Sequence, residues 1–246
     1  MERSKHILIF ILLMLFQTQI FAFSSGIYQA YISSDMNRWK VIMDDFHRKP
    51  EKSHGEVLEL VNYMYGYVGW CMGNNNQKKA GEYIRSAEDY LEKLEKAGYQ
   101  PSMVHAYRSA FYGFRVGVHK LQAPVLGPKS VQHAKYSIET DPKNPYGYIQ
   151  YGNSQFYMPA IFGGSKNVAL EYFQKAEQLM ELNGKNLVQN WNYLSLLAMI
   201  GQTFEELNRF GEAKKYYEKI LKTEPGFQWV KDVLYPAIIK KTGNEK

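Results

Sequence analysis

The sequence contains one cysteine, Cys71, so it can form neither an intrachain disulfide nor a zinc site built from cysteines. It also lacks a His-Glu-x-x-His pair for zinc, a Gly-x-Ser-x-Gly nucleophile turn and the Walker order of a phosphate-binding loop. Convincing strand or hairpin patterns are missing as well. Because no nucleophile, base or metal set is visible, we expect a protein that is not an enzyme and that holds no cofactor or metal.

A strong excess of charge of one sign is absent too. Lys and Arg number 30 against 24 Asp and Glu, and the two signs alternate along the chain, as in residues 92–96. This alternation is typical of solvated helix faces and unlike a track for a polyanion. We therefore expect no nucleic-acid partner.

One apolar run stands out near the N-terminus. Arg3 and Lys5 precede an unbroken apolar stretch at 7–16, and residues 17–25 then become polar and small, with Ala22 as the expected last residue before cleavage. The stretch is too short for a membrane span, which needs ~20 residues, and it matches a secretory signal. We expect residues 1–22 to be a signal peptide, so that the protein is exported, periplasmic or secreted, without a stable membrane span after cleavage. An uncleaved anchor is the alternative.

What the sequence does contain is helical periodicity, from Tyr28 to Ile239. Gly and Pro residues interrupt it at regular intervals, for example at 49–50, 127–128 and 225–226. The intervals predict about ten helices. Their expected ranges are 27–48, 54–72, 77–97, 102–121, 129–140, 145–158, 166–182, 190–207, 210–223 and 229–241.

The clearest internal repeat covers residues 194–227. In its first helix, Leu197, Ile200 and Phe204 lie three and four residues apart and form one apolar stripe. Gly201 removes a side chain where the second helix must approach to ~8–10 Å.

The second helix of this repeat supplies the matching pattern. Ala213 is a second small residue at the seam, and Tyr217 and Ile220 fill the space between this helix pair and its neighbours. Pro225 ends the helix because it has no amide hydrogen. A second repeat, at 145–182, has Gly152 and Ala169 in the corresponding places, with a longer turn between its helices.

These residues resemble the tetratricopeptide repeat family, well over 145–225 and more weakly over 53–142. The stretches at 30–39, 126–130 and 158–169 are similar to exported tetratricopeptide-like proteins of Bacteroidetes, whose function is unknown. A more distant similarity is to the repeat subunit of periplasmic substrate-uptake systems, whose lipid-attachment cysteine has no counterpart here. The resemblance implies an all-α fold at 27–241, a single domain built as a right-handed α-solenoid of antiparallel helix pairs.

A binding surface is the function that such an array favours. The first helices of stacked pairs line the concave side and offer the residues outside their apolar stripe to a partner. We take as candidate partner-binding residues Tyr146, Asn153, Phe156, Gln202 and Glu206.

Aromatic and amide groups on one strip suit an extended peptide or a small ligand. We expect a non-catalytic scaffold that binds a protein or peptide, and the alternative is a small-molecule-binding component of a periplasmic uptake system. An open groove would favour a peptide and a closed cavity a small ligand. A third possibility is that the 158–164 turn or the N-terminal helices fill the groove.

Overall fold

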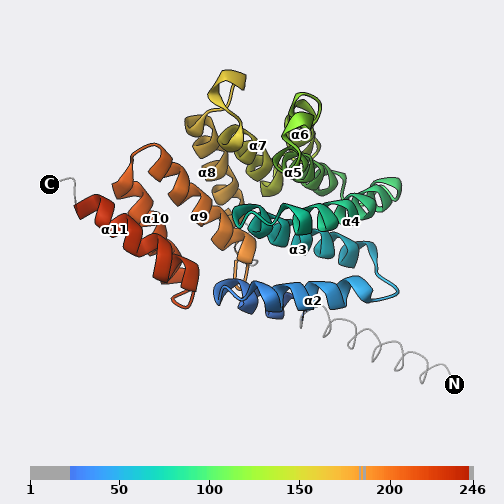
Figure 1. Ribbon diagram of the computed structural model, residues 1–246, viewed down its shortest axis with the longest axis horizontal. Coiled ribbons are helices and arrows are strands. Elements are labelled where there is room, and N and C mark those ends of the chain that lie inside the picture. The colour runs from blue at the N-terminus through green and yellow to red at the C-terminus, as the bar shows by residue number, and fades with distance from the viewer. Residues whose placement is uncertain (1–22, 183, 185–186, 244–246) are drawn as a thin grey trace.

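The computed structural model describes residues 23–182, 184 and 187–243, so the expected signal peptide at 1–22 lies outside the described residues. Over the described ranges every regular element is a helix and none is a strand (Figure 1). A helical segment at 23–32 comes first. The α-helices that follow are α2 (Met36–Arg48), α3 (His54–Gly73), α4 (Gln77–Lys96), α5 (Pro101–Val118), α6 (Ala123–Thr140), α7 (Pro145–Tyr157), α8 (Lys166–Leu182), α9 (Trp191–Glu206), α10 (Phe210–Thr223) and α11 (Tyr235–Gly243). Short helical turns also occur, among them the 3₁₀ turns Lys120–Gln122 and Ala160–Phe162 and the π turn Val230–Leu234.

The long helices form four consecutive pairs, α3 with α4, α5 with α6, α7 with α8, and α9 with α10 (Figure 1). The second helix of each pair also packs against the first helix of the next pair. Among the first helices, α3 packs closely on α5 and α5 on α7, whereas the backbones of successive second helices lie further apart. Long side chains bridge α8 and α10, where Tyr216 and Lys219 bond to Glu177. The array therefore curves toward the first helices, which form its concave side. This confirms the predicted all-α, tetratricopeptide-like solenoid.

Local capping explains where several helices begin. The Ser53 side chain accepts a hydrogen bond from the Glu56 amide while the Glu56 carboxylate accepts one from the Ser53 amide, a complete capping box. Before α8, the Ser165 hydroxyl accepts a hydrogen bond of 3.3 Å from the Val168 amide. Both starts confirm the prediction from the sequence.

Glycines let the two helices of a repeat approach each other. A Cβ at Gly201 would lie 2.5 Å from Cε1 of Tyr217, and a Cβ at Gly152 would lie 2.6 Å from Cε1 of Phe173. Tyr217 and Phe173 are fully buried. In both repeats an aromatic ring of the second helix therefore fills the space opposite the glycine. The sequence predicts Ala213 and Ala169 at these places, and the rings come from the residues four positions later.

Two predicted boundaries were wrong. The helix expected at 27–48 is divided, because Ser34 has a φ of 56° and the Asp35 carboxylate then caps α2 through the Arg38 amide. At 127–128 we expected a break, yet α6 runs through Pro128. Pro128 lacks the amide that would bond the carbonyl of Pro124, but both prolines are exposed, so water can satisfy that carbonyl.

The N-terminal helices join the two ends of the solenoid. The Tyr28 hydroxyl donates a hydrogen bond of 2.7 Å to Glu224, which follows α10. Trp39 of α2 and Trp191 of α9 pack edge to face with ring centroids 5.0 Å apart. They meet over Gly66 of α3, where a Cβ would lie 2.7 Å from Trp39 and 2.8 Å from Trp191. A contact this close requires glycine at position 66.

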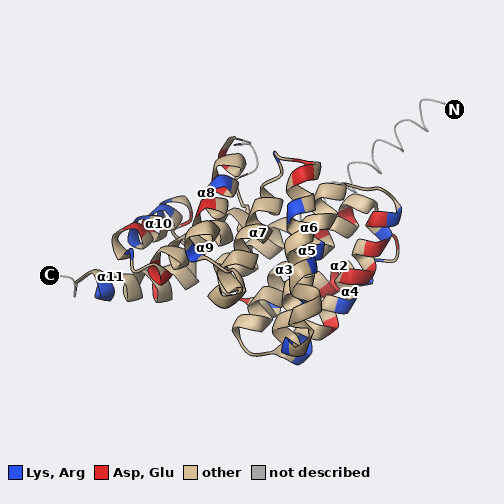
Figure 2. Cartoon of the chain, turned by 90° about the horizontal axis from the view of Figure 1, so that it is seen from above, with Lys and Arg blue, Asp and Glu red and all other residues tan. Residues whose placement is uncertain are grey.

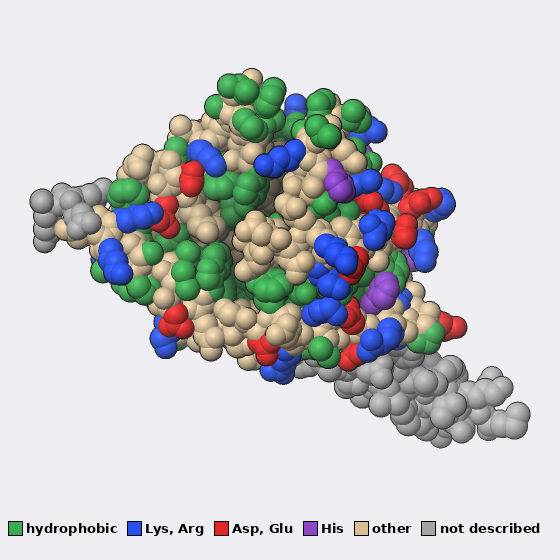
Figure 3. Space-filling model, viewed as in Figure 1, with side chains coloured by type: hydrophobic (Ala, Val, Ile, Leu, Met, Phe, Trp, Pro, Cys, Tyr) green, Lys and Arg blue, Asp and Glu red, His purple; other side chains and the backbone are tan. Residues whose placement is uncertain are grey.

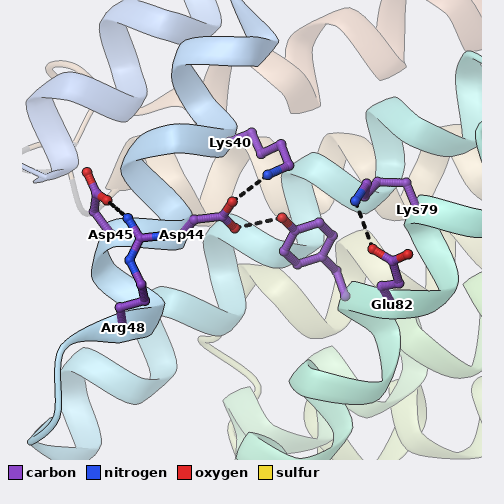
Figure 4. A network of polar contacts seen from close by, with 7 residues as sticks. Lys40, Asp44, Asp45, Arg48, Lys79 and Glu82 are labelled. Atoms are coloured by element: carbon purple, nitrogen blue, oxygen red, sulfur yellow. Dashed lines mark hydrogen bonds and ion pairs between the residues drawn. The ribbon is translucent and has the colours of Figure 1, made fainter.

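Polar contacts hold α2 against α4 on the other side (Figure 4). The Tyr83 hydroxyl donates a hydrogen bond of 2.6 Å to Asp44, which also pairs with Lys40. Burial opposes ionisation of Asp44, but the bonds from Lys40 and Tyr83 outweigh it and lower the pKa of Asp44. Its neighbour Asp45 points elsewhere and pairs with Arg48, so the two carboxylates do not act together.

We predict that Gly201→Ala destabilises the protein. The new methyl group would enter the ring of Tyr217, which is buried and donates a hydrogen bond to Glu205, so the ring has nowhere to move. The loss should be about 1–3 kcal/mol in the free energy of unfolding, measured by urea denaturation.

The matched control is Gly81→Ala in α4. No atom lies within 4 Å of a Cβ at Gly81, so only helix propensity changes and stability should rise by about 0.5–1 kcal/mol. Equal stability of the two variants would show that the Gly201 seam is not closely packed.

Candidate functional site

Charge is divided between the two layers of the solenoid (Figure 2). The helix α7 has no charged residue, and α9 has none before Glu205. The second helices α4 and α10 carry many Lys, Arg and Glu residues. The concave side is therefore mostly neutral, and a ligand there would contact rings and amides in preference to ions.

A continuous series of aromatic rings lies on this concave side. Tyr31 of the N-terminal segment packs on Trp191 of α9, and Trp191 packs on Tyr65 of α3. Tyr65 then contacts Tyr107 of α5, which contacts Tyr146 of α7. The centroid distances, in this order, are 5.7, 6.4, 5.9 and 5.9 Å. We call these five residues the aromatic floor.

The aromatic floor is partly open to solvent. Tyr31, Tyr65 and Tyr146 keep part of their surface exposed, while Trp191 and Tyr107 are buried beneath them. Burial nevertheless raises the pKa of the Tyr31, Tyr65 and Tyr146 hydroxyls, because protein surrounds them on most sides. A side chain that is partly exposed and yet surrounded by protein on most sides is typical of a concave surface. Figure 3 shows hydrophobic side chains gathered in the hollow between the α9 side and the α3–α5 side.

Amide groups lie beside the rings. Nδ2 of Asn153 donates hydrogen bonds to the Tyr65 hydroxyl, at 3.3 Å, and to Oε1 of Gln150, at 3.1 Å. Both amides come from α7 and link it to α3. They orient Tyr65 within the aromatic floor, and Nε2 of Gln150 is buried without a partner.

Four buried side-chain polar atoms have no hydrogen-bond partner in the described part of the chain, and all four belong to first helices. They are Asn62 Oδ1, Tyr63 OH, Gln150 Nε2 and Trp191 Nε1. Buried polar atoms are normally paired, because an unpaired one costs about 1–3 kcal/mol. Trp191 belongs to the aromatic floor and Gln150 lies beside it, whereas the Tyr63 ring packs against Trp39 and Phe46 of α2.

One carboxylate, Glu59 of α3, is close to the same region. It is partly exposed, and its charge acts on the hydroxyls of Tyr63, Tyr107 and Tyr146. Burial raises the pKa of Glu59 above its ordinary value of 4.5. Interactions with the side chains of Tyr63 and Asn62 lower this pKa, but by less than burial raises it. No described Lys or Arg forms an ion pair with it, whereas Glu56 in the same helix pairs with Lys49.

Of the residues predicted from the sequence, Tyr146 and Asn153 lie at the aromatic floor. Both are half-buried, and they contact Tyr107 and Tyr65 respectively. The structure therefore puts both residues on the first-helix face, and their role in binding stays a prediction.

Phe156 and Glu206 lie further along the same side and are joined through Lys166. The Lys166 ammonium is 3.4 Å from the centroid of the Phe156 ring and 3.8 Å from the Glu206 carboxylate. Gln202 is half-buried on α9, and no described contact joins it to either group. The structure thus places two of the five predicted residues at the aromatic floor and two at a rim around Lys166, and Gln202 belongs to neither group.

The sequence did not identify Glu59, Tyr65, Tyr107 or Trp191. The helices α3 and α5 lack the Gly and Ala landmarks of the better repeats, so the face that each turns inward could not be fixed. A usable signal was present in α3, where Glu59, Asn62 and Gly66 recur at helical spacing in an otherwise apolar helix.

Other kinds of site were sought among the described residues. No group of three His, Cys, Asp or Glu side chains there could hold a metal ion. None of the described helices has the length and apolar character needed to cross a membrane. His105 and His133 do meet, with their Nδ1 atoms 3.0 Å apart, but on the α5–α6 seam.

Comparisons with known proteins agree with this architecture. The family model of the tetratricopeptide repeat matches residues 194–227. No curated protein shows significant sequence similarity to the chain. Among solved structures, the HusA haemophore from Porphyromonas gingivalis is similar with a TM-score of 0.59 and 20% identity, over 73% of this chain and 92% of that one. A thermophilic tetratricopeptide protein from Thermus thermophilus, TTC0263, gives a TM-score of 0.57 and 14% identity, over 84% and 93%.

At these identities the two structures show a shared fold and nothing further. Together with the matched repeat and the four stacked helix pairs, they confirm the resemblance deduced from the sequence. The chain contains one matched tetratricopeptide repeat and is similar in fold to the HusA haemophore from Porphyromonas gingivalis and to a tetratricopeptide protein from Thermus thermophilus.

Proposed function

We propose that this protein is an exported, non-catalytic scaffold that binds an extended segment of a protein or peptide along its concave side. The observation that carries the proposal is the aromatic floor, a row of rings contributed by five different helical segments on a nearly uncharged face. Rings of Tyr and Trp supply large contact areas at a low cost in side-chain entropy.

The polar groups of the floor fit a peptide backbone. An extended segment presents amide donors and carbonyl acceptors at short intervals, and these need partners once they leave water. Gln150 and Trp191 hold buried donors without a partner and Asn62 a buried acceptor, so a segment that displaces the side chains covering them gains hydrogen bonds. The rim at Lys166 and Glu206 would then contact charged side chains at the edge of the bound segment.

Export is supported by the sequence of residues 1–22 and by the likeness to a haemophore, a protein that acts outside the cell by the meaning of that name. Catalysis would need a nucleophile, an acid–base pair or a metal, and the concave side presents mainly rings and amides instead.

A second candidate is a carrier of a flat small molecule. The likeness to the haemophore covers nearly all of that protein, and stacked rings suit a planar aromatic ligand such as a porphyrin. Titration with haemin separates the two functions. Saturable binding of haemin that is lost on substitution of Tyr65 would favour the carrier over the peptide scaffold.

We predict that Phe156→Ala combined with Gln202→Ala lowers the affinity of the protein for a peptide selected from a random library by at least about tenfold. Both side chains are half-buried and outside the apolar stripe, so the melting temperature should change little. Fluorescence anisotropy gives the affinity and circular dichroism gives the melting temperature.

The control is Gly164→Ala, in the turn before α8. Its Cβ would lie 1.8 Å from the carbonyl oxygen of Met158, so this variant should melt at a lower temperature while its folded fraction binds as the parent does. The opposite pattern, with binding lost in Gly164→Ala and kept in the double variant, would place the site at the turn.

A further inference from the structure

Four turns join the two helices of a pair, and in a stacked array such turns lie along one edge (Figure 1). The turns at 74–76 and 207–209 have three residues each, and their exposed side chains are polar. Three residues are therefore enough to join two helices of this array. The turns at 119–122, between α5 and α6, and at 158–165, between α7 and α8, are longer, so the fold does not require their extra residues.

The two longer turns and the helix ends beside them expose large apolar side chains. Five such side chains are more than half exposed, namely Leu121 (97%), Val125 (61%), Tyr157 (71%), Ile161 (85%) and Phe162 (71%). Figure 3 shows the two turns as neighbouring projections with hydrophobic outer surfaces. We call these five residues the apolar tips. A single exposed apolar side chain is ordinary, but a group of five along one edge is typical of an interaction surface.

Hydrogen bonds hold both turns in these conformations. In the longer turn, the Phe162 amide donates a hydrogen bond of 2.9 Å to the Pro159 carbonyl. In the shorter one, the Gln122 amide donates a hydrogen bond of 2.9 Å to the His119 carbonyl. The apolar tips are therefore presented to water from an ordered backbone, and a partner that covers them does not have to order it first.

The charge around the apolar tips is positive. Residues 97–170 contain seven Lys and Arg residues and two acidic residues, Glu139 and Asp141, whereas the rest of the chain has 23 basic and 22 acidic residues. The even mixture of signs along the chain as a whole thus does not extend to this part. Lys120 and Lys129 lie on either side of the first tip, both are exposed, and neither forms an ion pair with a described acidic residue.

Shape and charge together indicate what covers the apolar tips. Interfaces between proteins gather their apolar groups in one closely packed patch, whereas these side chains stand on two separate projections. A lipid bilayer can receive separate side chains, because its interface deforms around them and accommodates aromatic rings at the level of the headgroups. Anionic headgroups also attract lysine side chains near the surface.

We propose that the apolar tips dock this protein on the surface of an anionic lipid bilayer. Leu121, Ile161 and Phe162 enter the interface, and Lys120 and Lys129 contact the headgroup phosphates. The aromatic floor belongs to helix faces and not to these turns, so a bilayer and a ligand contact different residues. The inference therefore does not depend on what the concave side binds.

The test measures co-sedimentation of the exported protein with two kinds of vesicle, one of phosphatidylcholine alone and one with about a third of phosphatidylglycerol. Binding to the anionic vesicles should be at least about tenfold stronger, and raising the salt concentration should weaken it. Parent and variants share one N-terminus, so the apolar stretch at 7–16, which lies outside the described residues, contributes equally to all of them.

Two pairs of substitutions separate the apolar and the electrostatic contributions. Ile161→Gln with Phe162→Gln should lower the partition coefficient on anionic vesicles by at least about tenfold, because two apolar side chains no longer leave water on binding. Lys120→Gln with Lys129→Gln should remove the preference for anionic vesicles. Leu121→Gln, in the other projection, is an independent variant that should also weaken binding. All these side chains are exposed, so the melting temperature should stay that of the parent.

The matched controls change equally exposed side chains elsewhere. Val41→Gln with Val233→Gln replaces two apolar side chains that are 58% and 53% exposed and lie outside the two turns. Lys175→Gln with Lys231→Gln removes two exposed charges from other helical segments. Both double variants should bind vesicles as the parent does.

Insertion itself is measured with Phe162→Trp in anionic vesicles that contain brominated phosphatidylcholine. Fluorescence of the added indole should be quenched, whereas that of Val41→Trp should not. Failure of the parent to bind anionic vesicles, or equal binding by the Ile161 and Phe162 double variant, would overturn the inference. If the parent instead forms dimers in sedimentation velocity and the double variant does not, a second copy of the chain covers the apolar tips and the bilayer proposal is wrong.

Discussion

The concave side depends on one contact, the meeting of Trp39 and Trp191 over Gly66. Through it, α2 at the beginning of the fold and α9 in the last repeat are held against the same point of α3. The first helices α7 and α9 scarcely touch, so stacking alone would leave the last repeat attached mainly through α8. On its other side, the last repeat is attached to the N-terminal helices by the contact of the two tryptophans and by the Tyr28–Glu224 hydrogen bond. The N-terminal helices therefore complete the hollow and supply Tyr31 to its aromatic floor, and they do not simply fill it.

A second constraint is the division of charge between the layers. The second helices face water and can carry ion pairs at little cost, since exposed pairs contribute only ~0–1 kcal/mol each. The first helices face one another across a concave surface, where an unpaired charge is expensive. Four buried polar atoms of the first helices lack a hydrogen-bond partner among the described residues. Groups that cost stability in the free protein and cluster on one accessible face are typical of binding sites, because a ligand can satisfy them.

The sequence predicted most of the fold because the relevant signals are local. The helices α8 and α10 have the bounds expected from the sequence, because Gly163 and Gly164 precede α8 and Pro225 and Gly226 follow α10. Local signals failed at Pro128, where the helix tolerates a proline on its exposed side, and at Ser34, whose positive φ divides a continuous periodic pattern. Tyr146 and Asn153 were predictable because Gly152 fixes the rotation of α7. Glu59 and Trp191 were not, because their surroundings come from helices far apart in the sequence.

The most direct measurement of the central claim, that ligands bind at the aromatic floor, uses the indole N–H signals of the four tryptophans in a ¹⁵N-labelled sample. The Trp39 indole already donates a hydrogen bond of 3.2 Å to the Tyr63 carbonyl, whereas the Trp191 indole has no partner. Titration with a peptide selected from a random library should therefore shift the Trp191 signal most, with smaller changes at Trp39. An unchanged Trp191 signal at saturation, together with shifts at Trp70 or Trp229, would contradict the account, because the ligand would then be bound elsewhere.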